Sequence, residues 1–197
     1  MALFSKQYPP EIAPRIPPGQ RLVKTWPVLH YGPIPTFDGQ NWDLELGGLV
    51  ENPVTLSYQQ LRDLPNVTVD ADMHCVTGWT TLDNTWTGVS FRTLKELAKP
   101  SPEARWVVAH CQYGYTSNLS LDAMDDDDVL VAWGNHGRDL EPEHGWPLRL
   151  VVPGKYFWKS AKWLRGIELS AVDKPGFWER YGYHNEADPF REERYQF

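Results

Sequence analysis

Hydrophobic and polar residues alternate along several short stretches of the chain, as they do in strands that are buried on one face. Residues 42–46 alternate in this way up to a Gly-Gly pair, where we expect the strand to end because glycine interrupts strands. Residues 66–73 alternate again and lead towards Cys75. The pattern therefore predicts a strand that delivers Cys75 at its end.

Two segments carry the spacing and the end signals of short helices. Ser57 with Gln60 three residues later matches a capping box, and this helix would end before Pro65. Between residues 90 and 99 apolar side chains recur at helical spacing, and Pro100 ends the pattern. We therefore expect two short helices in the first half of the chain.

Further apolar runs predict four more strands, at residues 105–111, 129–133, 148–152 and 163–169. Many strands with few short helices indicate an α+β fold built on a mixed β-sheet. With 197 residues the chain has the length of a single domain. We expect a proline-rich extended arm packed on the body (1–40), a main domain (41–172) and a C-terminal tail (173–197).

Composition narrows the classes of function. Ten tryptophans among 197 residues exceed average usage and indicate an aromatic-rich core. The net charge of -7 argues against general nucleic-acid binding, which needs a basic surface. No run of about 18 apolar residues is present, so no membrane span is expected. Two cysteines can form at most one disulfide, and without a secretion signal we expect reduced thiols and a cytoplasmic location.

The sequence carries no common metal-binding motif. The acidic run from Asp125 to Asp128 lacks the spaced oxygen ligands and the glycine of a calcium loop, so a solvated turn is the better interpretation. A zinc site at Cys75 is disfavoured, because the chain has no Cys-x-x-Cys or His-x-His spacing.

Cys75 lies among polar and small residues in the sequence HCVTGW, residues 74–79. A free cysteine is most often a small buried hydrophobe. A thiol at a strand end can also bind a metal or act as a nucleophile. Both interpretations of Cys75 stay open at this point.

The charge pattern inverts between Arg149 and Arg165, where five basic residues and no acidic residue occur in an otherwise acidic chain. Lysines with Ser160 and backbone N–H groups can bind a phosphate there, and the alternative is a solvated basic turn. The preceding turn places His144 at one end and Arg149 at the other. Either side chain can hydrogen-bond a heterocycle or a phosphate, which favours an anion site.

Together these segments resemble the molybdopterin-binding domain of the sulfite oxidase family, which includes the periplasmic methionine sulfoxide reductase subunit. The resemblance extends from His30 to Glu168. Residues 74–79, followed by Trp-Thr-Gly at 86–88, are similar to the segment in which a cysteine gives its thiolate to molybdenum. The resemblance implies the α+β fold of that domain for residues 41–172.

The resemblance also implies a Mo-molybdopterin cofactor with Cys75 as the protein ligand of the metal, since a soft thiolate suits this centre. The residues implied to contact the cofactor are His30, Tyr31, Cys75, Cys111, His144, Arg149, Ser160, Ala161 and Lys162. The tail is similar to a segment that reaches the active site. Tyr183 is therefore a candidate catalytic residue beside Cys75, although it can equally be a core aromatic.

Two departures from the family pattern bear on the substrate. Sulfite oxidases carry arginines around the sulfite pocket, and the corresponding positions here are Leu29 and Thr80. Without charge-assisted hydrogen bonds a sulfite dianion would bind poorly. We therefore expect an oxidoreductase that transfers an oxygen atom on a small substrate, with reduction of a sulfoxide or N-oxide favoured, and an unidentified redox partner.

Two other functions remain open from the sequence. The first is a non-catalytic molybdopterin-binding or carrier protein, because the substrate-pocket arginines are the residues that differ. The second is a cysteine-nucleophile hydrolase in which His110, His136 or His144 activates Cys75. The hydrolase hypothesis explains the thiol but leaves the basic loop unexplained.

Overall fold

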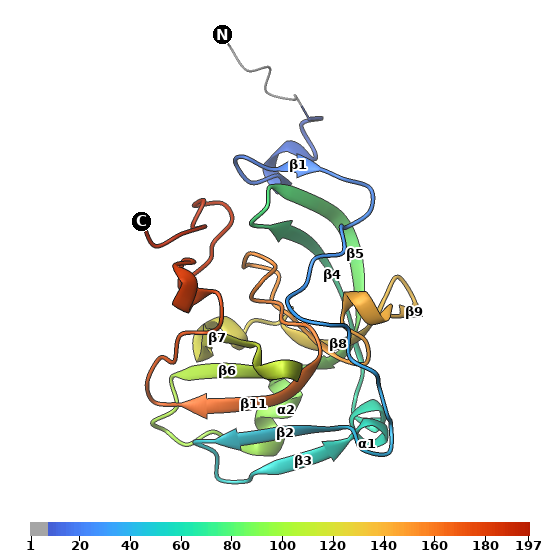
Figure 1. Ribbon diagram of the computed structural model, residues 1–197, viewed down its shortest axis with the longest axis vertical. Helices are drawn as coiled ribbons and strands as arrows, with labels where there is room; N and C mark the ends of the chain where they lie inside the picture. The colour runs from blue at the N-terminus through green and yellow to red at the C-terminus, as the bar shows by residue number, and fades with distance from the viewer. Residues whose placement is uncertain (1–7) are drawn as a thin grey trace.

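A computed structural model describes residues 8–197, and these residues form two β-sheets with short helices at their margins (Figure 1). The first sheet has the strand order β1-β5-β8-β10, with β4 also paired to β5 and β9 to β8. Its strands are β1 (Arg21–Leu22), β4 (Val67–Cys75), β5 (Trp79–Ser90), β8 (Leu130–Asn135), β9 (Arg138–Asp139) and β10 (Arg149–Val151).

The second sheet has the order β3-β2-β11-β6-β7. Its strands are β2 (Asp43–Gly48), β3 (Val54–Ser57), β6 (Trp106–Cys111), β7 (Thr116–Ser120) and β11 (Leu164–Ser170). The pairs β1/β5 and β2/β11 are parallel and the other pairs are antiparallel. The predicted α+β fold with mixed sheets is therefore confirmed.

The helices are short. They are α1 (Tyr58–Asp63), α2 (Phe91–Ala98) and α3 (Leu121–Met124), with 3-10 turns η1 (Ala13–Arg15), η2 (Gln112–Gly114), η3 (Pro142–His144) and η4 (Glu179–Tyr181). Both bonds of the predicted capping box are present, because Ser57 and Gln60 each accept from the other's backbone N–H. Ser90 caps α2 by accepting from Thr93.

One predicted strand end was wrong. Strand β2 continues through Gly47 and Gly48 and pairs there with β11. A Cβ atom at Gly48 would lie 2.2 Å from the carbonyl oxygen of Leu169. The missing side chains therefore let the two strands approach each other, and the glycines extend the strand instead of ending it.

The longest strand, β5, was not predicted. It forms a hairpin with β4 that rises above the second sheet in Figure 1. Trp79, Thr80 and Thr81 are buried in succession, so this strand lacks the alternation that marks a half-exposed strand. Gly88 lets β8 approach closely, since a Cβ there would lie 2.0 Å from the carbonyl oxygen of Val131.

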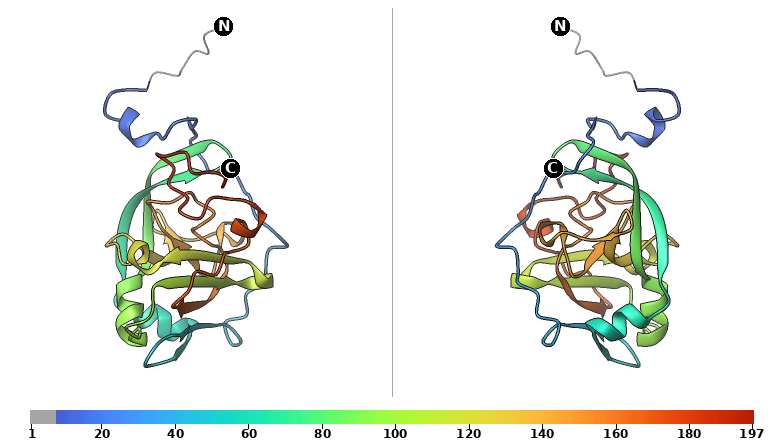
Figure 2. Two further views of the ribbon diagram at one scale, coloured as in Figure 1. Left: turned by 90° about the vertical axis from the view of Figure 1, so that its left-hand side faces the viewer. Right: turned by 90° about the vertical axis from the view of Figure 1, so that its right-hand side faces the viewer.

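The arm and the tail both pack on the hairpin. In the described part of the predicted arm, β1 pairs with β5 and Arg15 forms an ion pair with Asp72. Residues 1–7 of that arm lie outside the described residues. From the tail, Arg194 donates to the carbonyl of Val76, next to Cys75. Segments from both ends of the chain therefore surround the turn after Cys75 (Figure 2).

The acidic run lies in the turn after α3, where Lys95 pairs with Asp125 and Arg92 with Asp127. Asp127 is 87% exposed, as expected of a solvated turn. Across residues 8–197 no group of three or more metal-ligating side chains is assembled. No described helix has the length and apolar character needed to cross a membrane.

Candidate active site

A cavity of about 350 Å³ is bordered by the arm, the β4–β5 turn, strand β10 with the loop after it, and the tail. Its volume is in the range of ligand-binding pockets. Of the predicted site residues, those that line it are His30, Tyr31, Cys75, His144, Arg149, Ser160, Ala161, Lys162 and Tyr183. The structure thus brings together residues from four distant parts of the chain.

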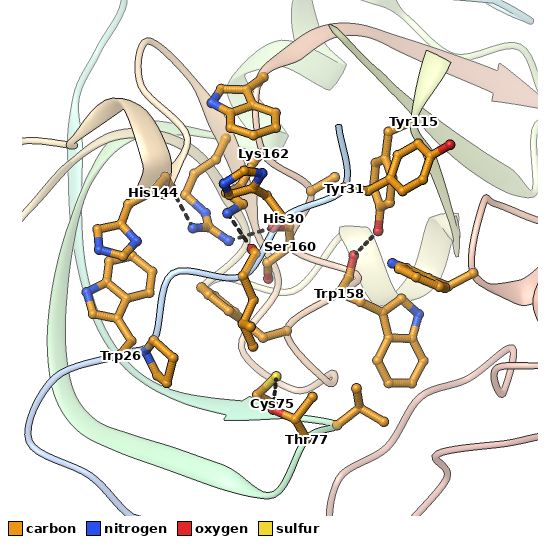
Figure 3. A pocket seen from close by; sticks show the side chains of 18 of the residues that line it. Trp26, His30, Tyr31, Cys75, Thr77, Tyr115, His144, Trp158, Ser160 and Lys162 are labelled. Carbon is orange, nitrogen blue, oxygen red and sulfur yellow. Dashed lines mark hydrogen bonds between the residues drawn. The ribbon is translucent and has the colours of Figure 1, made fainter. Parts of the chain in front are cut away.

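Cys75 is the last residue of β4, and its side chain faces the cavity (Figure 3). The tight turn to β5 closes with a hydrogen bond from the Gly78 N–H to the Cys75 carbonyl, and Gly78 has a φ of 89° that favours glycine. The Sγ atom lies 3.2 Å from the Thr77 hydroxyl oxygen. Burial raises the pKa of the thiol, so a bound cation is needed to favour the thiolate.

Arg149 is a buried cation without a carboxylate partner among residues 8–197. Its guanidinium donates to the carbonyls of His144 at 2.7 Å, Ser160 at 2.6 Å and Leu150 at 3.4 Å. A guanidinium has five N–H donors, so two remain for a ligand. Burial lowers the pKa of Arg149 to about 9. An anion in the cavity would offset this cost, because it pairs with the buried charge.

Lys162 lies beside Arg149 because the two residues form an antiparallel β-bridge. Its ammonium donates to the carbonyls of Leu29 at 2.6 Å and Glu143 at 2.8 Å, which leaves one of its three donors. Burial, and then the charge of Arg149, lower the pKa of Lys162 to about 7. The bond to Leu29 also fixes the arm against the cavity.

Ser160 contributes a hydroxyl donor beside Arg149 and Lys162. Its Oγ accepts from the Val152 N–H at 2.9 Å, and the hydroxyl hydrogen stays available. Gly145 makes room for this group of residues, since a Cβ there would lie 3.1 Å from both Arg149 and Lys162 side chains. Arg149, Lys162 and Ser160, which we call the donor cluster, can therefore bind an anion with up to four hydrogen bonds.

Aromatic and imidazole rings cover the arm side of the cavity. Trp26 stacks on His144, with ring centroids 4.2 Å apart and an interplanar angle of 7°. Burial lowers the pKa of His144, which keeps the imidazole neutral. His30 packs edge-on against Trp163, and its Nδ1 lies 2.8 Å from the Gly32 carbonyl oxygen. The ring nitrogens of an imidazole can donate a hydrogen bond to a heterocycle or accept one from it.

Tyr183 is half-buried on the tail and lines the cavity. Its ring packs against Trp158 and Trp178, so it is an aromatic packing residue and a lining residue at once. Tyr31 lies on the arm, 4.3 Å from the ring of Phe177. Tyr31 and Tyr183 therefore both contribute phenol groups to the lining of the cavity.

Cys111 is the predicted site residue that does not line the cavity. It shares a strand face with Val107 and Ala109 and belongs to the core between the sheets. Burial raises the pKa of its thiol well above the ordinary range. Both cysteines are free, and the structure gives Cys111 no access to a ligand in this cavity.

The two positions where sulfite oxidases carry arginine differ in their placement. Leu29 lines the cavity and is 49% exposed. Thr80 does not line it, because its side chain is buried and bonded to His74 at 2.9 Å. Burial lowers the pKa of His74 to about 4, so this imidazole is neutral. Leu29 is therefore the departure that faces the cavity.

A hydrolase triad is not assembled at Cys75. The hydrogen-bond partner of its Sγ within residues 8–197 is Thr77. His110 pairs instead with Glu168 on the second sheet. His144 stacks on Trp26 and forms no hydrogen bond to the Cys75 thiol within the described residues, which a base that activates the thiol would need.

Several lining residues were missed by the sequence analysis. They are Trp26, Pro27, Val76, Thr77, Trp79, Tyr115, Phe157, Trp158, Trp163 and Trp178. The excess of tryptophan was a signal for the five tryptophans among them, and their positions follow no strand or helix period. Some of the aromatic residues that suggested an aromatic-rich core therefore line the cavity.

Comparison with known proteins identifies the family of the chain. The sequence profile described as "Oxidoreductase molybdopterin binding domain" matches residues 31–178. An uncharacterized oxidoreductase of Bacillus subtilis is 44% identical over 193 residues, which is 98% of each chain. The protein-methionine-sulfoxide reductase catalytic subunit of Campylobacter jejuni is 30% identical over 78% of this chain and 59% of its own length.

The fold is also found among solved structures. The crystal structure of the sulfane dehydrogenase SoxCD from Paracoccus pantotrophus matches with a TM-score of 0.66. The match covers 92% of this chain and 57% of the SoxCD chain, at 20% sequence identity. This likeness concerns the fold of the two sheets.

Proposed function

The chain belongs to the oxidoreductase molybdopterin-binding domain family, and from this membership we propose that it reduces a small uncharged sulfoxide or N-oxide by oxygen-atom transfer. The observation that carries the proposal is the cavity in which Cys75 and the donor cluster meet, with the uncharged side chain of Leu29 in its lining. The relative from Campylobacter jejuni, named for methionine sulfoxide reduction, supports the same reaction class.

The residues present fit a molybdenum-pterin cofactor. Arg149, Lys162 and Ser160 have unused donors that would bind its phosphate, and Cys75 would supply a soft thiolate to the metal in the same cavity. His144 and His30 line the same cavity and would hydrogen-bond the heterocyclic ring system of the cofactor. When bound, the molybdenum centre supplies two-electron oxygen-atom exchange, and the protein supplies binding and orientation.

The reaction balances with a reduced one-electron carrier. The S=O bond breaks, the oxygen leaves as water after taking up two protons, and two electrons come from two molecules of the carrier. Tyr183 is the proposed proton donor at the entrance, since its side chain lines the cavity. A carrier protein without turnover is the competing function, and it predicts bound cofactor but no reduction.

The proposal is tested by expressing the protein in a host that makes the cofactor. Molybdenum and pterin are measured first, and then oxidation of reduced methyl viologen by dimethyl sulfoxide and trimethylamine N-oxide. We expect turnover with at least one of these acceptors. Full cofactor content without turnover would favour the carrier function, and activity without molybdenum would overturn the proposal.

Leu29→Arg is expected to increase binding of anionic substrates. An arginine here would place a guanidinium at the cavity, where it can form charge-assisted hydrogen bonds to an oxyanion. We expect sulfate inhibition of sulfoxide reduction to strengthen by roughly tenfold, the effect of one such bond. Leu29→Gln is the uncharged control. Equal sulfate inhibition in both variants would contradict the placement of Leu29 at the substrate side.

Anion binding by the cofactor-free protein is expected to depend on pH through Lys162. The pKa of Lys162 is lowered to about 7, so its ammonium is charged below this pH and neutral above it. Sulfate keeps its charge in this range, and we expect its affinity to fall roughly tenfold between pH 6.5 and 8.5. Calorimetry measures this change. Lys162→Met should bind sulfate more weakly and without this pH dependence.

We also propose a cytoplasmic location, which is supported by two free cysteines in a protein of this size. The electron donor is proposed to be a separate redox protein. Fractionation of cells, followed by detection of the protein, tests the location directly.

A further inference from the structure

Three aromatic rings form one side of the cavity, and we call them the aromatic wall: Trp158, Trp178 and Tyr183. The ring of Tyr183 lies 5.0 Å from that of Trp158 at 88° and 5.0 Å from that of Trp178 at 30°. Trp158 comes from the loop after β10, whereas the other two come from the tail. The wall is therefore assembled only when the tail is docked.

A buried ion pair fixes the wall. Lys159 and Glu179 are 2.6 Å apart, and each side chain is 1% exposed. Glu179 also accepts the indole N–H of Trp158 at 2.8 Å, which joins the loop to the tail. Gly176 allows this contact, since a Cβ there would lie 2.5 Å from the Glu179 carboxylate. The wall is thus a preorganised surface rather than a set of mobile rings.

Charge is distributed unevenly around the cavity. The cationic side chains of the lining, Arg149 and Lys162, are held by carbonyl groups next to His144. Figure 3 shows Trp158 and Tyr115 on one side of the cavity, His144 and Trp26 on the other, and Cys75 between them. In Figure 3 Ser160 and Lys162 lie between these two groups, and the aromatic wall itself contributes rings and a phenol but no charged side chain to the lining.

We propose that the aromatic wall binds the non-reacting substituent of the substrate, and that this substituent is apolar, such as an aryl or a larger alkyl group. The inference rests on the proposed sulfoxide reduction and specifies its substrate class. Rings stabilise an apolar or aromatic group by burial and by edge or stacked contacts. They also favour the sulfide product, because a thioether sulfur packs well against aromatic rings. A charged substituent would lose its hydration there without gaining a partner.

The test compares three sulfoxides on the same molybdenum-loaded enzyme, with two molecules of reduced methyl viologen, a one-electron donor, supplying the two electrons of each turnover. The substrates are methyl phenyl sulfoxide, dimethyl sulfoxide and free methionine sulfoxide, which is zwitterionic. We expect kcat/KM for the phenyl compound to exceed both others by at least about tenfold. Equal values, or a preference for the zwitterion, would overturn the inference.

A pair of variants tests whether the aromatic wall causes the preference for methyl phenyl sulfoxide. Trp178→Leu removes a wall ring and should reduce the phenyl-to-methyl ratio of kcat/KM several-fold through KM. Tyr181→Leu is the matched control, because Tyr181 lies on the same tail, is 70% exposed and does not line the cavity. This control should keep the wild-type ratio. An unchanged ratio in Trp178→Leu, or an equal loss in both variants, would overturn the assignment to the wall.

Product inhibition of the wild-type enzyme gives a readout that does not depend on the folding of any variant. Methyl phenyl sulfide should inhibit at least about tenfold more tightly than dimethyl sulfide, and equal inhibition would overturn the inference.

The proposed sulfoxide reduction and the proposed role of the aromatic wall can fail separately. Absence of turnover on every sulfoxide with full molybdenum content overturns the proposed function together with the inference. Turnover without an aryl preference overturns the inference alone.

Discussion

Replacing Cys75 with serine is expected to leave the protein folded and the pterin bound, while oxygen-atom transfer falls by at least about a hundredfold. The pterin is held by other residues, because the donor cluster and the imidazoles make their contacts independently of the thiol. The hydroxyl is a hard and weakly acidic ligand that replaces a soft thiolate poorly. Loss of an outer-shell partner alone costs ten- to a hundredfold in such sites, so loss of a ligand should cost more.

The measurements are pterin fluorescence, molybdenum content per chain and kcat with reduced viologen. Cys111→Ser is the matched control, because this buried thiol lies outside the cavity. It should lower thermal stability while retaining cofactor and turnover per molybdenum. If Cys75→Ser kept full turnover with normal metal content, Cys75 would not be the ligand.

Arg149→Met is expected to abolish retention of the cofactor during purification. Two guanidinium N–H groups are available to the anion, and a hydrogen bond to a charged group contributes about 1.5–3 kcal/mol. Their loss corresponds to a decrease in affinity of about a hundredfold to ten-thousandfold. Methionine has a similar length and is apolar, so it can fill the space between Trp26, Trp86 and Phe157 that the arginine occupies.

The outcome is measured as pterin and molybdenum per chain, with circular dichroism as the check of folding. Arg165→Met is the control, because Arg165 belongs to the same basic segment but pairs with Asp43 and does not line the cavity. It should keep the wild-type cofactor content. A folded Arg149→Met protein with full cofactor content would show that the anion is held elsewhere.

Local signals made part of this fold predictable. The capping box at Ser57 depends on residues three positions apart, and it is present as expected. The strand that ends at Cys75 also followed from alternation. Strand β5 was not predicted because polar residues such as Thr80, Thr81 and Asn84 occupy buried positions in it. The role of Gly48 was misread because it depends on a strand that is distant in sequence. Local patterns therefore predicted elements, whereas close approaches between elements could not be predicted.

The same distinction applies to the site. The basic segment and the turn before it indicated an anion site, since the charge inversion is visible along the chain. The stacking of Trp26 on His144 and the ion pair of Lys159 with Glu179 join residues far apart in sequence. Cys111 shows the reverse case, because the resemblance implied a cofactor contact there, whereas its side chain packs in the core with Val107 and Ala109.

A single-turnover experiment tests the central claim most directly. The molybdenum-loaded protein is reduced, freed of excess reductant and mixed anaerobically with methyl phenyl sulfoxide. We expect the wild-type protein to form one molecule of methyl phenyl sulfide per reduced molybdenum, and the Cys75→Ser protein to form almost none. Absence of sulfide from the reduced wild-type protein, together with oxidation of sulfite by the oxidised protein, would contradict the proposed sulfoxide reduction.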